Sequence, residues 1–254
     1  MFPFRHSVSA VALALALAAG AAQAATVHVQ FDNPIFSGVP APAYDVVTIT
    51  YPALGTGAPR SVTTAAGRFQ GTATNVVGVS PSIFTDSVDD LFMYCYDVYE
   101  AVGSGWSVDY TINLDGETAR TLDFLGAVNA VLSQGQANVD PYAWLHPTSG
   151  AMAAAIQLGI WESKYEASGW NLANGSFSAT GLDAGTHVHL NSFIASINGS
   201  ASLDGRYAMT LEAAGVQDMI TGDPPASVPE PGMAALLGLA GAGAWVARRR
   251  RPRS

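Results

Sequence analysis

Short runs of apolar residues alternating with polar ones recur through residues 25–221, between glycines, prolines and asparagines. Runs of this length that are rich in Val, Thr and Tyr are typical of β-strands. In 106–114 the alternation is clearest, and the residues on its apolar face are Trp106, Val108, Tyr110 and Ile112. The pattern predicts strands, each with one buried face, at 26–31, 44–51, 75–79, 91–99, 106–114 and 206–211.

Two segments interrupt this β pattern with apolar residues at helical spacing. The first predicted helix covers 118–133. The second begins with either Thr148 or Ser149 as its N-cap and continues to about Glu166. We expect 171–185, rich in Gly, Ser and Asn, to be surface loop or short strands. Together these elements predict a β-rich α+β fold, with antiparallel sheets or a sandwich and two inserted helices.

The N-terminal pattern is that of a secretion signal. Arg5 and His6 precede an apolar run at 8–19, which is too short to span a bilayer comfortably. The run leads to Ala22-Gln23-Ala24, whose small first and third residues fit the subsites of a signal peptidase. We predict an N-terminal signal helix that is cleaved after Ala24, and the alternative is an uncleaved anchor.

The C-terminal pattern has three parts in a fixed order. Pro229-Glu230-Pro231 comes first, and an apolar stretch at 232–247 follows. As a helix this stretch rises about 24 Å, short of the ~30 Å hydrocarbon core, so it predicts a weak membrane span. The final part is a cluster of arginines that would hold the end of the chain in the cytoplasm, Arg248, Arg249, Arg250 and Arg251.

This tail resembles the PEP-CTERM sorting family, in which a Pro-Glu-Pro motif precedes a hydrophobic helix and an arginine-rich terminus. The resemblance implies an exosortase-type transpeptidase that cuts near the motif in a Gram-negative envelope. It also implies a mature protein in the envelope, at the cell surface or in the extracellular matrix. An ordinary single-pass anchor is the alternative. The predicted division is a signal peptide, an exported domain, a linker and a sorting tail, at 1–24, 25–221, 222–227 and 228–254.

The charge of the exported part narrows its partners. Between residues 25 and 227, five basic residues stand against nineteen acidic ones, a formal charge of −14. Nucleic acid is excluded as a partner, because phosphate binding needs concentrated lysine and arginine. No residue pattern calls for a cofactor. His187 and His189 would share one face of a strand as two metal ligands do, but no acidic or cysteine motif stands beside them, so we predict surface histidines and no metal.

Two motifs in the exported part carry candidate chemistry. The single cysteine stands in Tyr94-Cys95-Tyr96-Asp97, and Gln157 stands in Ala-Ile-Gln-Leu-Gly-Ile-Trp on the second predicted helix. This pair resembles the Cys-Gln thioester domains of bacterial surface adhesins, over about residues 85–200. The resemblance implies a bond between the Cys95 sulfur and the Gln157 side chain, which then captures an amine on a surface or matrix polymer.

The neighbouring residues have expected roles in such a site. Trp161, one turn from Gln157, could cover the bond against hydrolysis, and Asp97, on the strand face of Cys95, could position a proton or a helix-end amide. Tyr94 and Tyr96 point away from Cys95. Gly159 stands where the family usually has alanine, and its small size would let the strand approach the helix.

The alternative for the cysteine is an inert, buried small hydrophobe in an inert structural component of a matrix or polysaccharide layer. An enzyme is not expected, because no catalytic residue set stands out.

Overall fold

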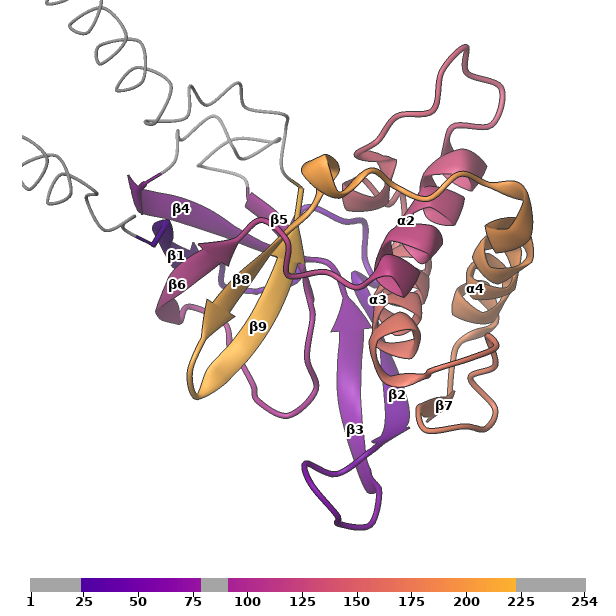
Figure 1. Cartoon of the computed structure of the whole chain (residues 1–254), viewed down its shortest axis with the longest axis horizontal. Helices are drawn as coiled ribbons and strands as arrows, with labels where there is room; N and C mark the ends of the chain where they lie inside the picture. The colour runs from indigo at the N-terminus through magenta and orange to yellow at the C-terminus, as the bar shows by residue number, and fades with distance from the viewer. Residues whose placement is uncertain (1–23, 79–90, 223–254) are drawn as a thin grey trace, which may run out of the picture.

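The computed structural model describes residues 24–78 and 91–222, and these residues form a β-barrel beside a layer of helices (Figure 1). All neighbouring barrel strands are antiparallel, in the closed order β1-β4-β5-β9-β8-β6. The barrel strands are β1 Thr26–Phe31, β4 Phe69–Val77, β5 Leu91–Cys95, β6 Ser107–Asn113, β8 Met209–Ala213 and β9 Val216–Thr221.

A second, three-stranded sheet lies between the barrel and the helices, in the order β3-β2-β7. Its strands are β2 Tyr44–Tyr51, β3 Arg60–Gly67 and β7 Ser178–Thr180. In Figure 1 the β2–β3 hairpin projects below the rest of the molecule. The chain passes from β3 straight into β4, so one run of residues belongs to both sheets. Arg68 stands at the junction, buried, and donates hydrogen bonds to the carbonyls of Ser37 and Leu145.

The alternating pattern predicted the barrel strands correctly where it was strongest. In β6 the side chains of Val108, Tyr110 and Ile112 are buried, and the intervening side chains are exposed. Trp106 does not belong to this face, because it precedes the strand and is 50% exposed. Other predicted bounds need correction. Strand β4 begins at Phe69 rather than 75, β5 ends at Cys95, and a short 3-10 helix, Gly205–Tyr207, occupies the start of the last predicted strand.

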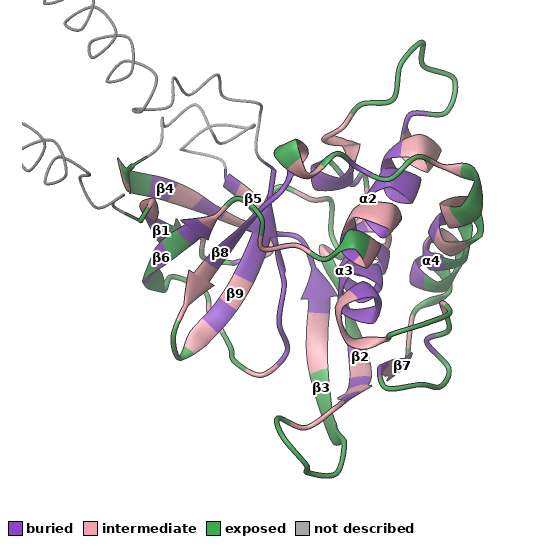
Figure 2. Ribbon diagram, viewed as in Figure 1, coloured by how far each residue is buried: buried purple, intermediate pink, exposed green. Residues whose placement is uncertain are grey.

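Both predicted helices are present. α2 spans Ala119–Leu132, and the Thr118 side chain caps it by accepting a hydrogen bond from the N–H of Thr121. α3 spans Gly150–Tyr165, and of the two candidate N-caps it is Ser149 that accepts from the N–H of Met152. α3 is the most buried helix in Figure 2, because β2 and β3 cover one side and the other two helices cover another.

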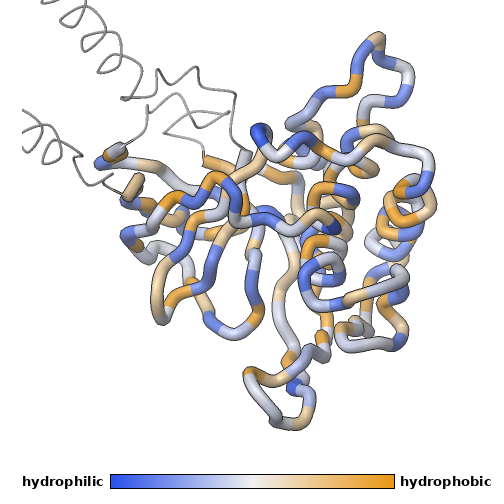
Figure 3. The backbone as a smooth tube through the Cα atoms, viewed as in Figure 1, coloured by the Kyte–Doolittle hydropathy of each residue, from blue (hydrophilic) through white to orange (hydrophobic). Residues whose placement is uncertain are grey.

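A third helix was not predicted. α4 spans Ala184–Ser196, where the sequence led us to expect a loop and a histidine-bearing strand. Its buried residues, Thr186, Leu190 and Phe193, are spaced four and three apart and face α2 and α3. His187 and His189 therefore do not share a face, since residues two apart in a helix point in nearly opposite directions. The backbone tube in Figure 3 accordingly mixes polar and apolar positions along α4.

The β-rich α+β class with antiparallel sheets is confirmed, and the part of the chain that the structure describes contains three α-helices instead of the two inserted helices predicted, and a closed barrel instead of a sandwich. The 3-10 helices are Ala143–Leu145, Ile197–Gly199 and Gly205–Tyr207. Within 24–78 and 91–222, no helix is long and apolar enough to cross a bilayer. The predicted signal helix and the apolar stretch at 232–247 lie outside the described residues.

Candidate functional site

The two residues singled out by the motifs, Cys95 and Gln157, are in direct contact. The side-chain Oε1 of Gln157 accepts a hydrogen bond of 2.8 Å from the backbone N–H of Cys95. Its Nε2 donates another of 2.8 Å to the backbone carbonyl of Cys95. Gln157 is 0% exposed and Cys95 is 2% exposed. The amide of Gln157 is thus held flat against the residue that carries the thiol, a contact that we call the Cys95–Gln157 clasp.

The arrangement of the strands explains why a side chain, and not another strand, binds the backbone N–H and C=O of Cys95. Backbone groups along an antiparallel strand point alternately to the two neighbouring strands. Tyr96 donates its N–H to the carbonyl of Asp218 in β9, so the N–H and C=O of Cys95 point the other way, toward β4. Phe69 pairs with Met93, so the next opposing residue in that register would be Gly67. Gly67 pairs instead with Tyr44 in the second sheet, and the Gln157 amide takes the vacated place.

The side chains of β5 separate the thiol from its neighbouring tyrosines, as predicted. Tyr94 stacks on Trp144 and donates its hydroxyl to the Trp144 carbonyl. The Tyr96 hydroxyl accepts from the N–H of Thr118 at the start of α2. Both tyrosines face the helices, and by strand alternation Cys95 faces the opposite side.

On that side Cys95 lines a cavity of about 400 Å³. Its floor includes Trp161 and Gln217 as well as Cys95, and its wall is the face of the β2–β3 hairpin that carries Ile49 and Val62. The Trp161 indole donates to the carbonyl of Asp97, which fixes the ring beside the thiol. The Gln217 amide donates to the same carbonyl. Cys95 is thus a buried part of the lining of this cavity.

Asp97 holds the chain that follows β5. Its Oδ1 accepts from the N–H groups of Tyr99 and Glu100, and its Oδ2 accepts from the N–H of Asp218 at 2.6 Å. These amides belong to a loop and to β9, and none is a helix-end amide. Asp97 therefore shapes the loop 97–100 beside the cavity, and its carboxylate lies near enough to act on the thiol electrostatically.

The surroundings keep the unlinked thiol protonated. Burial raises the pKa of Cys95 well above its ordinary value, and the Asp97 carboxylate raises it further. The exported part has one lysine, Lys164, whose ammonium lies 3.7 Å from the centre of the Tyr96 ring, on the helix side of β5. Burial lowers the pKa of Lys164. Its position keeps it away from the face of the strand that Cys95 presents to the cavity.

The expected role of Gly159 is wrong. A Cβ at this position would collide with the Phe124 ring of α2, and not with a strand. The glycine therefore permits close packing of α3 against α2, which sets the position of the helix that carries Gln157.

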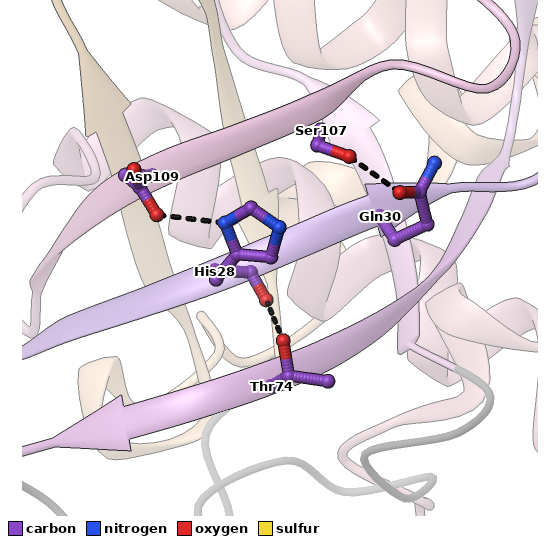
Figure 4. A network of polar contacts seen from close by, with 5 residues as sticks. All are labelled: His28, Gln30, Thr74, Ser107 and Asp109. Atoms are coloured by element: carbon purple, nitrogen blue, oxygen red, sulfur yellow. Dashed lines mark hydrogen bonds and ion pairs between the residues drawn. The ribbon is translucent and has the colours of Figure 1, made fainter.

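A separate polar network lies on the outside of the barrel (Figure 4). The His28 ring on β1 contacts Asp109 on β6 at 2.7 Å, and its backbone carbonyl accepts from Thr74 on β4. The hydroxyl of Ser107 bonds to Gln30 instead of to the histidine. These contacts join three neighbouring strands without presenting a nucleophile to His28. Among the described residues, no group of three His, Cys, Asp or Glu is arranged to hold a metal ion.

Comparison with known proteins identifies the tail. Residues 227–251 match the PEP-CTERM protein-sorting motif. The chain is an exported, exosortase-sorted protein. The matched range contains Pro229, Glu230, Pro231 and the cluster Arg248–251, and the match implies processing by an exosortase and a signal peptidase. Export to the cell envelope or surface follows.

These comparisons gave nothing for the rest of the chain: no curated protein and no solved structure matched it. The resemblance of residues 85–200 to thioester domains has no counterpart among them, so it remains a hypothesis. The sequence also failed to indicate the residues that complete the cavity, notably Tyr51, Tyr99, Glu100 and Gln217. No motif marks them, because they come together only when the hairpin, the loop after β5 and β9 meet.

Proposed function

We propose that the exported domain attaches covalently to amine-bearing partners through an internal thioester between Cys95 Sγ and Gln157 Cδ. The observation that carries the proposal is the Cys95–Gln157 clasp, in which the amide of one residue lies against the backbone of the other and both residues are buried. An amide is a poor acyl donor in water, and such a reaction depends on holding both groups in a near-attack geometry.

Formation of the bond is a condensation. The Cys95 sulfur attacks Gln157 Cδ, the bond between Cδ and Nε2 breaks, and the thiol proton leaves with the nitrogen as ammonia. The hydrogen bond from the Cys95 N–H to Oε1 would stabilise the negative charge that develops on this oxygen. The raised thiol pKa means that the thiolate is scarce, so maturation is expected to be slow and to occur once per molecule.

Capture of a partner reverses this acyl transfer onto a new nitrogen. A neutral amine attacks Cδ, the bond between Cδ and Sγ breaks, and the sulfur receives the electron pair and one amine proton. The products are an amide crosslink and a free Cys95 thiol. Exposure to water is limited, because Trp161 and the hairpin wall enclose the sulfur.

A structural role for the clasp is the second candidate, and the same two hydrogen bonds favour it. They satisfy the backbone of a buried strand end, which an inert matrix component also requires. In that case Cys95 is a small buried hydrophobe without chemistry.

Intact mass of the mature domain distinguishes the two. The proposal expects the wild type to be lighter than its sequence mass by one ammonia, and Cys95→Ser to have the full mass. A nucleophile such as methylamine should add its own mass to the wild type and release one alkylatable thiol. A wild-type domain of full mass, with a thiol that is alkylated only after unfolding, would overturn the proposal and support the structural role.

A further inference from the structure

The cavity beside Cys95 has a charge and a shape that define what reaches the site. Among the described residues that line it, Glu100 is the single Asp, Glu, Lys, Arg or His side chain. Glu100 is exposed at the mouth, and its Oε1 accepts from the N–H of Gly215 in the turn between β8 and β9, which fixes the carboxylate there. The mouth of the cavity is therefore anionic.

Tyrosine rings line the recess behind Glu100. Tyr51 of β2 and Tyr99 of the loop after β5 meet edge to face, with ring centres 5.6 Å apart. The hydroxyl of Tyr99 donates to the carbonyl of Pro52, which holds its ring against the hairpin. Tyrosine faces attract cations. Behind them lie the apolar side chains of Ile49 and Trp161.

From this lining we propose that the cavity is an access channel for a primary ammonium on an unbranched alkyl chain, a lysine side chain of a partner protein, guided to the site by Glu100. This inference rests on the proposed function, since it assigns the route and the substrate class of that site. The carboxylate concentrates the ammonium at the mouth, the ammonium loses its proton to water, and the neutral amine then advances along the tyrosines toward Cys95 Sγ, to which Gln157 Cδ is joined.

Arg60 carries a positive charge, opposite in sign to that of Glu100. It begins β3, stands opposite Tyr51 in the hairpin register and acts electrostatically on Tyr99. A cation at this position repels an incoming ammonium. Substitutions at Glu100 and Arg60 are therefore expected to change the rate in opposite directions.

The test uses the mature domain carrying its thioester and the probe Nα-acetyl-lysine methylamide, and intact mass is followed over time. Glu100→Gln, which retains the oxygen that accepts from Gly215, should slow capture about three- to fivefold at low salt, and Arg60→Gln should accelerate it. Added salt should reduce the difference between wild type and Glu100→Gln. The uncharged nucleophile hydroxylamine should react equally with all three, and Asp115→Asn, an exposed carboxylate outside the cavity, serves as the control for net charge.

A second pair of variants tests the route by making the cavity narrower. Val62→Trp places an indole on the hairpin face that lines the cavity, and Val46→Trp places one on the opposite face. The first should slow lysine capture at least tenfold and the second should leave it unchanged. The intact mass of each variant is measured first, to establish that one ammonia has been lost. Normal thioester mass with wild-type capture rates in Glu100→Gln and Val62→Trp would overturn the channel and leave the proposed function intact. Full mass in the wild type would overturn both.

Discussion

The side-chain amide of Gln157 occupies the place of a neighbouring strand beside Cys95. This place is vacant because β4 begins only at Phe69, and the residues before Arg68 belong to β3 of the second sheet. A primary amide presents a C=O and an N–H along one edge, and the N–H and C=O of one residue in an extended strand point the same way, so one amide can satisfy both backbone groups. The same geometry that completes the sheet brings an acyl carbon next to a thiol-bearing residue.

Removing this amide is expected to destabilise the fold. Gln157→Ala leaves the N–H and the carbonyl of Cys95 without partners in a buried place and opens a cavity, so we expect a loss of about 2–4 kcal/mol in the free energy of unfolding. Urea denaturation followed by tryptophan fluorescence measures it. Gln136→Ala, on an exposed loop, should change stability by less than about 0.5 kcal/mol. Equal stability of the two variants would contradict the clasp.

The packing around Gly159 predicts a change in stability opposite to the one expected from helix propensity. Alanine is favoured over glycine by about 1 kcal/mol inside a helix. In α3, however, the new Cβ would collide with the ring of Phe124, so Gly159→Ala is expected to cost about 1–3 kcal/mol. Phe124→Leu should recover part of that loss when combined with it. Gly199→Ala, with open space around its Cβ, should be nearly neutral, and thermal unfolding compares all four proteins.

Glu162 should make stability depend on pH. Burial raises the pKa of this carboxyl in the folded protein above the ordinary value of 4.5, although Asn171 donates its N–H to Oε1. The folded state therefore holds the proton more tightly than the unfolded chain. The contribution of this group to stability is complete below about pH 4.5 and is lost as the pH rises through the folded pKa.

Glu162→Gln mimics the protonated side chain at every pH. Its free energy of unfolding, measured in urea, should exceed that of the wild type by a margin that grows from about pH 4 to about pH 7. Asp115→Asn, which changes an exposed carboxylate, should show no such trend. A margin that stays constant or shrinks with rising pH would mean that Glu162 is not destabilised when charged.

The sorting tail predicts a defect in processing. Replacing Pro229, Glu230 and Pro231 together by alanine should remove the sequence that the exosortase recognises, so the chain should accumulate with its tail attached. Immunoblotting of membrane and surface fractions in an exosortase-bearing host measures this. The same replacement in a host without exosortase should have no effect on the size of the protein, and normal trimming of the triple variant would show that another segment directs processing.

Local patterns in the sequence predicted much of the fold because their causes are local. Runs rich in Val, Thr and Tyr identified β1, β2 and β6, helical spacing of apolar residues identified α2, and a choice of two hydroxyl caps, Thr148 or Ser149, marked the start of α3. The prediction failed where local signals compete. The alternation in Thr186-His187-Val188-His189-Leu190 is typical of a strand. This segment is nevertheless part of helix α4, because Leu190 and Phe193 are buried where α4 packs against α2 and α3. Strands β3 and β9 were missed, because small and polar residues weaken their alternation.

The sequence by itself determined the sorting tail, whose motif is read along the chain, and the pairing of a cysteine strand with a glutamine helix as a hypothesis. Tertiary structure decided the rest of the candidate site. Gly67 and Cys95 would be opposite each other if β4 continued, and only the crossing of the chain into a second sheet opens the place that Gln157 fills. Tyr51 and Glu100 line one cavity for the same reason: residues distant along the chain become neighbours only through strand register and helix packing, which no local pattern contains.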